Sequence, residues 1–320
     1  MRIRNIIAMG AACVLALSLA SCGDDAGSPG TTTSGTDKVT IAMANLSLGG
    51  DYFVGMDQAV KDQGKALGFD VVSSNADGNE DKLLTDVQNF ISQKVDGIII
   101  SGAWLNDFKT ALTAAETAGI PVVLVDRLTS SKNYTAWIGP ENERMGKDIG
   151  AFIVDKLPQG GTAVIIRGGP EDNTIGIART SGVKSALTAA GNFTIEVATD
   201  FGGWNAGDGK TSMENMMAKL PKIDVVFCEN DDMCLGAQSA AADAGRSDQM
   251  FFCGIDGSAA AKAEIAKAGT NYLATGFNDP FVIGKKGVDV MKDILDGKTV
   301  AKDQPIDSPR ITAENVSQFL

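Results

Sequence analysis

Short, continuously apolar runs alternate with amphipathic stretches along the chain from Lys38 onward. The runs are rich in Val and Ile and do not alternate with polar residues, which is typical of strands buried on both faces of a sheet. Ten strands are predicted in this way, at residues 39–46, 70–74, 97–102, 121–127, 136–139, 162–168, 193–199, 224–230, 250–256 and 272–278.

The stretches between these runs carry helical periodicity. Leu83, Val87 and Phe90 form one apolar stripe, and Phe108 and Leu112 belong to another. Strands that alternate with helices form βαβ units, and these units build parallel sheets covered by helices. Ten strands are many for one such sheet, so we expect an α/β protein with two sheets of about five strands, in two domains.

Polar side chains follow several of the predicted strands. Asp126 and Arg127 follow one strand, and Asn230, Asp256 and Asn278 stand at the ends of three others. Ligands of open α/β sheets bind beyond the carboxyl ends of the strands. Carboxylates accept hydrogen bonds while guanidinium and amide groups donate them, which suits a ligand covered with hydroxyls. Each residue alone would more often be a turn or a helix cap, and only their convergence indicates a site.

Aromatic residues stand near the same strand ends. Tyr52 and Phe53 follow the first strand, and Trp204 lies in a glycine-rich loop. The apolar face of a sugar ring packs on an aromatic face, although an aromatic beside a helix start is more often part of the core. Trp104 follows the third strand, and the sequence leaves open whether it lines the site or packs on a helix.

The N-terminus has the pattern of an export signal. Arg2 and Arg4 precede an apolar run at residues 6–19, which is short for a membrane span. The signal ends at Cys22 in Leu-Ala-Ser-Cys, which matches the bacterial lipobox, and we expect this cysteine to carry a lipid such as palmitate. A plain secretory signal with an incidental cysteine is the alternative. Residues 23–37 are rich in Gly, Ser and Thr and predict a flexible tether after the signal peptide of residues 1–22.

Charge and composition exclude several functions. The chain has 320 residues, with 28 Lys and Arg against 40 Asp and Glu, for a net charge of −12. This acidity argues against nucleic-acid binding. Histidine is absent, which removes the commonest general base and zinc ligand. Cys228, Cys234 and Cys253 fit no metal pattern, so buried thiols are favoured, with one disulfide among them as the alternative.

Three motifs carry a resemblance to a known family. They are IPVVLVDR at residues 120–127, FCENDDM at 227–233 and GIDG at 254–257. The sequence resembles the periplasmic sugar-binding proteins of the ribose-binding type, which are substrate receptors of ABC importers, over residues 37–320. The resemblance implies a type I periplasmic binding protein, with two Rossmann-like lobes joined by a hinge of three crossovers. The lobes would be residues 38–140 plus 279–304, and 141–278 plus 305–320.

The resemblance also implies which residues contact the ligand. They are Tyr52, Phe53, Asp126, Arg127, Arg179, Trp204, Asn230, Asp256 and Asn278. Ribose receptors usually carry asparagine, phenylalanine and glutamine where this chain has Gly50, Trp204 and Asn278. A different pentose, a hexose or a polyol is therefore as good an expectation as ribose.

Together these observations predict a non-catalytic, lipid-anchored receptor for a monosaccharide or polyol. We expect a monomer, in the periplasm or on the cell surface, that delivers its ligand to the permease and ATPase of an ABC importer. No cofactor and no metal is expected, because the calcium loop of the related galactose receptors is not evident. A sensory receptor of the same fold, for chemotaxis or autoinducer-2, is the alternative. A transcription regulator would need an N-terminal DNA-binding unit, and an enzyme would need Asp126 and Asp256 as paired acids.

Overall fold

The computed structural model describes residues 38–102, 108–170 and 175–320. The predicted signal peptide, the tether, Cys22 and Trp104 lie outside the described residues. Within the described ranges, no helix has both the length and the apolar character that a membrane crossing requires.

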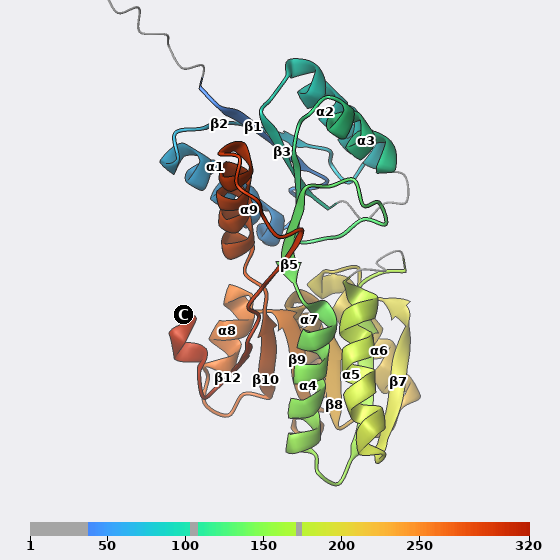
Figure 1. The fold of residues 1–320 in the computed structure, drawn as a ribbon. Coiled ribbons are helices and arrows are strands. Elements are labelled where there is room, and N and C mark those ends of the chain that lie inside the picture. Colours follow the sequence, from blue (N-terminus) through green and yellow to red (C-terminus); the bar gives the residue numbers. More distant parts are fainter. Residues whose placement is uncertain (1–37, 103–107, 171–174) are drawn as a thin grey trace, which may run out of the picture. The chain divides into compact units, whose positions relative to one another are not determined.

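One sheet is built mainly from the N-terminal part of the chain (Figure 1). Its described strands run in the order β11-β5-β4-β3-β1-β2, and every pair is parallel. These strands are β1 Thr40–Asn45, β2 Asp70–Asn75, β3 Gly97–Ser101, β4 Val122–Val125, β5 Ala136–Pro140 and β11 Asp303–Ile306.

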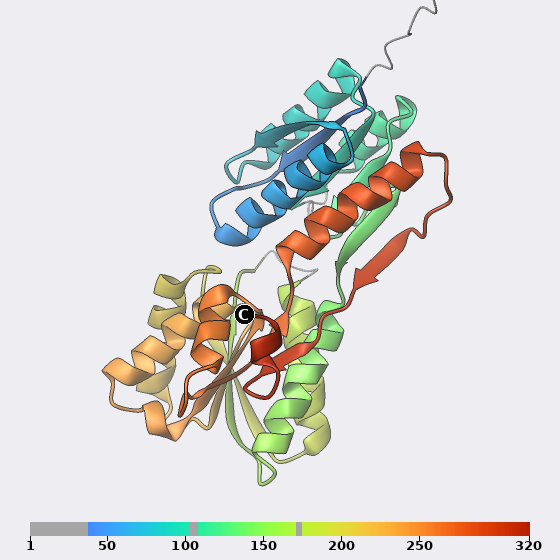
Figure 2. The same ribbon diagram turned by 90° about the vertical axis from the view of Figure 1, so that its left-hand side faces the viewer.

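Two pairs of helices cover the faces of this sheet. Helices α1 Asp51–Ala66 and α9 Pro280–Leu295 lie side by side and bury Met56 and Met291 against one face. Figure 2 shows α9, in orange-red, beside α1, in blue. Helices α2 Glu80–Gln93 and α3 Lys109–Thr117 pack on the other face. The continuous apolar runs of the sequence are thus strands with both faces buried.

The second sheet has the strand order β12-β10-β9-β8-β6-β7. Its strands are β6 Gly161–Arg167, β7 Phe193–Phe201, β8 Val225–Cys228, β9 Phe251–Asp256, β10 Tyr272–Phe277 and β12 Arg310–Thr312. One face packs on α4 Asn142–Lys156 and α5 Gly176–Ala190. The other packs on α6 Ala206–Lys219, α7 Asp231–Asp243 and α8 Ala259–Ile265.

All ten predicted strands are present, but two short strands were missed. β11 and β12 raise each sheet from the expected five strands to six in the described part of the chain. β12 pairs antiparallel with β10, so the second sheet is mixed and not purely parallel. Neither strand has an apolar run, and β11 contains Pro305, so only pairing with β5 and β10 makes them strands.

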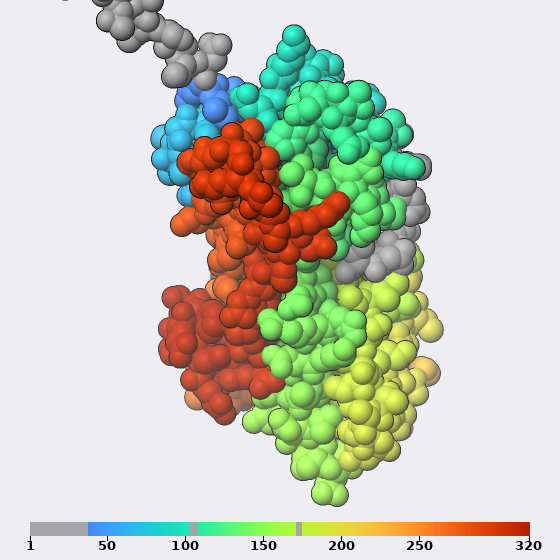
Figure 3. Space-filling view, viewed as in Figure 1, coloured from blue at the N-terminus to red at the C-terminus, as the bar shows by residue number. Residues whose placement is uncertain are grey.

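The chain passes from one sheet to the other after β5, after β10 and after β11. Pro305 and Ile306 pair with Gly139 and Pro140, so β11 belongs to the first sheet up to its last residue. After the last crossing, the C-terminal segment lies against α4, as Figure 3 shows in red and green. Arg310 Nη1 donates a hydrogen bond of 2.8 Å to the backbone oxygen of Asp148 there.

The three cysteines of the second sheet region are buried free thiols, as favoured from the sequence. The Cys234 thiol donates to the backbone oxygen of Cys253 at 3.2 Å. Burial raises the pKa of the thiols of Cys228 and Cys253 well above the usual value, so both stay protonated.

Candidate ligand-binding site

A cavity of about 550 Å³ lies where strands of both sheets end. Its volume falls in the range of small-molecule sites. All nine residues singled out in the sequence line it: Tyr52, Phe53, Asp126, Arg127, Arg179, Trp204, Asn230, Asp256 and Asn278.

Strand ends bring the polar members of this set together. Asp126 and Arg127 follow β4, Asn230 follows β8, Asp256 ends β9 and Asn278 follows β10. Parallel strands present their carboxyl ends at one edge of the sheet, so side chains far apart in sequence become neighbours there.

The backbone is strained at three residues that line the cavity. Asp126, Trp204 and Asp256 have φ values of 67°, 59° and 124°. Only Asp77 and Lys94 share a positive φ among the other non-glycine residues that the structure describes. Each such conformation costs about 1–3 kcal/mol, and strain of this kind concentrates at functional sites.

Arg179 is the buried centre of the polar network, with 2% of its surface exposed. Its Nη1 donates to the backbone oxygen of Glu229 at 2.6 Å and lies 3.0 Å from Asp256 Oδ1. Its Nε donates to Asn142 Oδ1 at 2.9 Å. The backbones of α4 and α5 must approach closely for this contact, since a Cβ at Gly146 would lie 2.1 Å from the oxygen of Arg179.

Glu229 was missed in the sequence, although it stands beside Asn230. It is 1% exposed, and its carboxylate accepts from the Gly168 backbone at 2.7 Å and from the Thr180 hydroxyl at 2.6 Å. These contacts hold the end of β8 at the level where its carbonyl meets Arg179. Glu229 therefore positions the site from outside the cavity.

Tyr52 joins two of the strand ends through its hydroxyl. The phenol donates to Asp126 Oδ1 at 2.9 Å and accepts from Asn278 Nδ2 at 2.9 Å. Burial, with Asp126 as the next cause, raises the pKa of Tyr52 well above the usual value, so the phenol remains a donor. Asn278 Nδ2 also lies 3.4 Å from Asp256 Oδ1.

The aromatic walls are held by close contacts. The ring of Tyr52 meets that of Phe53 edge to face at 5.3 Å. The Arg127 guanidinium lies 5.8 Å from the Trp204 ring centre, within the range of a cation–π contact. A Cβ at Gly168 would lie 2.0 Å from the Trp204 ring, so this position needs glycine.

Asn230 has the capping role that was the simpler interpretation of its sequence position. Its Oδ1 accepts from the Met233 backbone at 3.0 Å and caps α7, and its Nδ2 donates to the Trp204 backbone oxygen at 3.2 Å. Asn230 therefore caps a helix, holds the Trp204 loop and lines the cavity at once.

Burial raises the pKa of two carboxyl groups of the site. Burial raises the pKa of Asp256 to about 6, against the lowering effect of the Arg179 guanidinium. Burial, with the charge of Asp256 as the next cause, raises the pKa of Asp231 to about 7. Asp231 accepts from Tyr272, Thr275 and Ser258. It lines the cavity but was not selected, although it belongs to the same Asn-Asp-Asp signal as Asn230.

The cavity has further lining residues that the sequence did not single out as ligand contacts. They are Gly50, Asp51, Ile175, Asp231, Asp232, Gly257, Ser258, Ala259, Ala260, Lys262, Phe277, Asp279, Pro280 and Phe281. Phe281 is 55% exposed and comes three residues after Asn278, so the strand-end rule could have found it. Asp51 and Asp232 both line the cavity, and burial, with the charge of Asp51 as the next cause, raises the pKa of Asp232.

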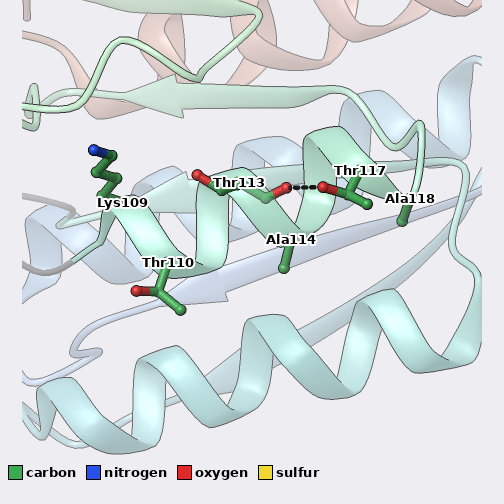
Figure 4. A pocket seen from close by; sticks show the side chains of 6 residues that line it. All are labelled: Lys109, Thr110, Thr113, Ala114, Thr117 and Ala118. Carbon is green, nitrogen blue, oxygen red and sulfur yellow. Dashed lines mark hydrogen bonds between the residues drawn. The ribbon is translucent and has the colours of Figure 1, made fainter.

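A second hollow, of about 590 Å³, follows the surface of α3 (Figure 4). Six residues of this helix and its end line it, and Lys109 is the one charged group among them. The Thr117 hydroxyl donates a hydrogen bond of 2.8 Å to the backbone oxygen of Thr113. This hollow thus combines neither carboxylates nor aromatic rings. In the described ranges, no cluster of Cys, Asp and Glu suits a metal ion.

The fold and the cavity define a class of protein: a binding protein that holds a polar small molecule at the strand ends of two α/β sheets. The chain matches the model of the periplasmic binding protein domain over residues 41–299, and it belongs to that family. The resemblance and the fold class drawn from the sequence are thereby confirmed.

Relatives with established roles are similar over most of their length. The chain is 30% identical to the ribose import binding protein of Bacillus subtilis, over 85% of this chain and 87% of that protein. It is 26% identical to the fructose import binding protein of Bifidobacterium longum, over 99% of this chain and 97% of that protein. The structure of an ABC transporter solute-binding protein from Mycobacterium smegmatis with bound glycerol superposes on this one with a TM-score of 0.81. The two sequences are 28% identical, and the match covers 88% of this chain and 96% of that one. These relatives are binding proteins, which confirms the expectation that the chain is not an enzyme.

Proposed function

We propose that this chain is the extracytoplasmic substrate-binding protein of an ABC importer, and that it binds a monosaccharide or a related polyol in the cavity. The observation that carries the proposal is one cavity that joins strand-end carboxylates, guanidinium groups and amides with the aromatic rings of Tyr52, Phe53 and Trp204. Sugar hydroxyls donate to the first group and accept from the others, while the ring face packs on the aromatics. The ribose, fructose and glycerol named for the relatives are all hydroxylated and uncharged.

Charge narrows the substrate class further. The described residues that line the cavity include six Asp side chains but three Lys or Arg side chains. An anionic ligand would enter an environment that already has excess negative charge, whereas a neutral one would meet no such penalty. The proposed ligand is therefore a neutral sugar or polyol and not a sugar phosphate or a sugar acid.

We infer that each lobe supplies part of the contacts to the ligand. Tyr52, Phe53, Asp126 and Arg127 belong to the lobe of the first sheet. Arg179, Trp204, Asn230 and Asp256 belong to the other, and Asn278 stands at a crossing between them. A ligand held by both lobes binds the closed form better, and this difference in affinity drives closure and presentation to the permease and its ATPase. A lipid on Cys22 would keep the monomeric receptor at the membrane.

The test is a thermal-shift screen of the chain without its signal peptide and with Cys22→Ser. The panel holds pentoses, hexoses, sugar alcohols, inositols and autoinducer-2, with sugar phosphates as the charged control. A ligand at 100 times its Kd stabilises the native state by about 2.7 kcal/mol, which is readily visible. A neutral hit whose thermal shift is reduced in Asp256→Asn supports the proposal. A panel without a neutral hit contradicts it, and a shift with autoinducer-2 alone would favour a sensory receptor.

A further inference from the structure

The Tyr52 hydroxyl occupies a place in the cavity that a ligand hydroxyl would otherwise take. It lies 2.9 Å from Asp126 Oδ1 and 2.9 Å from Asn278 Nδ2, at hydrogen-bond distance from an acceptor and a donor. A sugar hydroxyl that bound between the same two atoms would need the same distances. Because two oxygen atoms cannot share that position, the phenol excludes a ligand hydroxyl from it.

The Tyr52 hydroxyl uses both the acceptor and the donor at this position. The phenol has one proton and gives it to Asp126 Oδ1, and the raised pKa of Tyr52 keeps that proton in place. Asn278 Oδ1 is buried and has no hydrogen-bond partner among the described residues. Asn278 therefore meets this position through Nδ2, and the Tyr52 oxygen already accepts from that group.

We propose that Tyr52 is a specificity determinant whose phenol oxygen replaces one hydroxyl of the ligand. This inference rests on the proposed function and narrows its substrate class. The preferred ligand is a deoxy sugar, or a polyol without a substituent at that carbon.

Calorimetric titration of matched ligands tests this inference. Each hit from the sugar screen is compared with its analogues that lack one hydroxyl, on the wild type and on Tyr52→Phe. The wild type should bind one such analogue at least as tightly as its parent. Tyr52→Phe removes the phenol oxygen from between Asp126 Oδ1 and Asn278 Nδ2 and leaves room there for a ligand hydroxyl. The ratio of affinities should therefore move toward the hydroxylated parent by about tenfold or more, the size of one charge-assisted hydrogen bond.

Tyr134→Phe is the matched control. Tyr134 also donates to a carboxylate, Asp303 Oδ1 at 2.8 Å, in the lobe of the first sheet, and it does not line the cavity. This variant loses the same type of bond, and its affinity ratio should stay at the wild-type value.

Three results would overturn the inference. The first is a Tyr52→Phe variant that weakens parent and analogue equally, because the phenol would then only pack or contact the ligand. The second is a wild type that binds every analogue lacking one hydroxyl more weakly than the parent ligand. The third is a wild type that binds no sugar or polyol at all, which would remove the proposed function as well.

Discussion

Replacing Arg179 with methionine should destabilise the fold and abolish ligand binding together. Methionine keeps an unbranched apolar chain but removes a guanidinium that is 2% exposed. The change leaves Asn142 Oδ1 and the backbone oxygen of Glu229 without their donor, and it leaves the Asp256 carboxylate buried without its cation.

The size of the effect follows from that burial. Removing one partner of a buried ion pair costs about 3–5 kcal/mol, because the other charge remains uncompensated. At about 2–4 °C per kcal/mol, the melting temperature should fall by roughly 10 °C. Loss of Arg179 also removes the group that lowers the pKa of Asp256, so that pKa should rise above about 6.

Chemical denaturation of the apo protein, followed by thermal shift with the identified ligand, measures both effects. Arg144→Met is the control, because Arg144 forms an exposed pair with Glu141 at 3.2 Å that should contribute at most about 1 kcal/mol. Adding Asp256→Asn to Arg179→Met should restore part of the lost stability, because no unpaired charge is left. The deficit of Arg179→Met should also be smaller at low pH, where Asp256 is protonated.

Either of two results would refute this reasoning. One is an unfolding free energy for Arg179→Met within about 1 kcal/mol of the wild type, as for a surface arginine. The other is a double variant whose loss equals the sum of the two single losses, which would show that Arg179 and Asp256 act independently.

Three further results are expected. Because the pKa of Asp256 is raised to about 6, its carboxylate loses its charge as the pH falls through that value, and ligand affinity should fall with it. Asp256→Asn should flatten this profile, and a profile unchanged in the variant would contradict the assignment. Gly146→Ala should destabilise the fold by about 1–3 kcal/mol, because the new Cβ would lie 2.1 Å from the oxygen of Arg179; an equally stable variant in urea denaturation would contradict that packing. Trp204→Leu should weaken ligand binding about tenfold or more and reduce the ligand-dependent change in tryptophan fluorescence. Unchanged affinity would show that the Trp204 ring lines the cavity without contacting the ligand.

The strands of this protein could be predicted from sequence because each buries both faces. Such a strand must be continuously apolar, and this signal is local, so all ten apolar runs were found. The location of the cavity could also be predicted from the sequence, since polar residues at the carboxyl ends of parallel strands have to meet. For this reason the nine residues chosen from strand ends, aromatic loops and the resemblance all line one cavity.

Contacts between distant segments decided the rest. β11 and β12 are strands only because β5 and β10 offer unpaired edges to them, and their own residues carry no strand pattern. The burial of Glu229 and its hold on Gly168 and Thr180 depend on how β8 packs against α5 and β6. Likewise, the bridge from Tyr52 to Asn278 joins residues 226 positions apart. Residue type and spacing record what a short segment must bury, but hydrogen-bond geometry between such segments exists only after the sheets have packed.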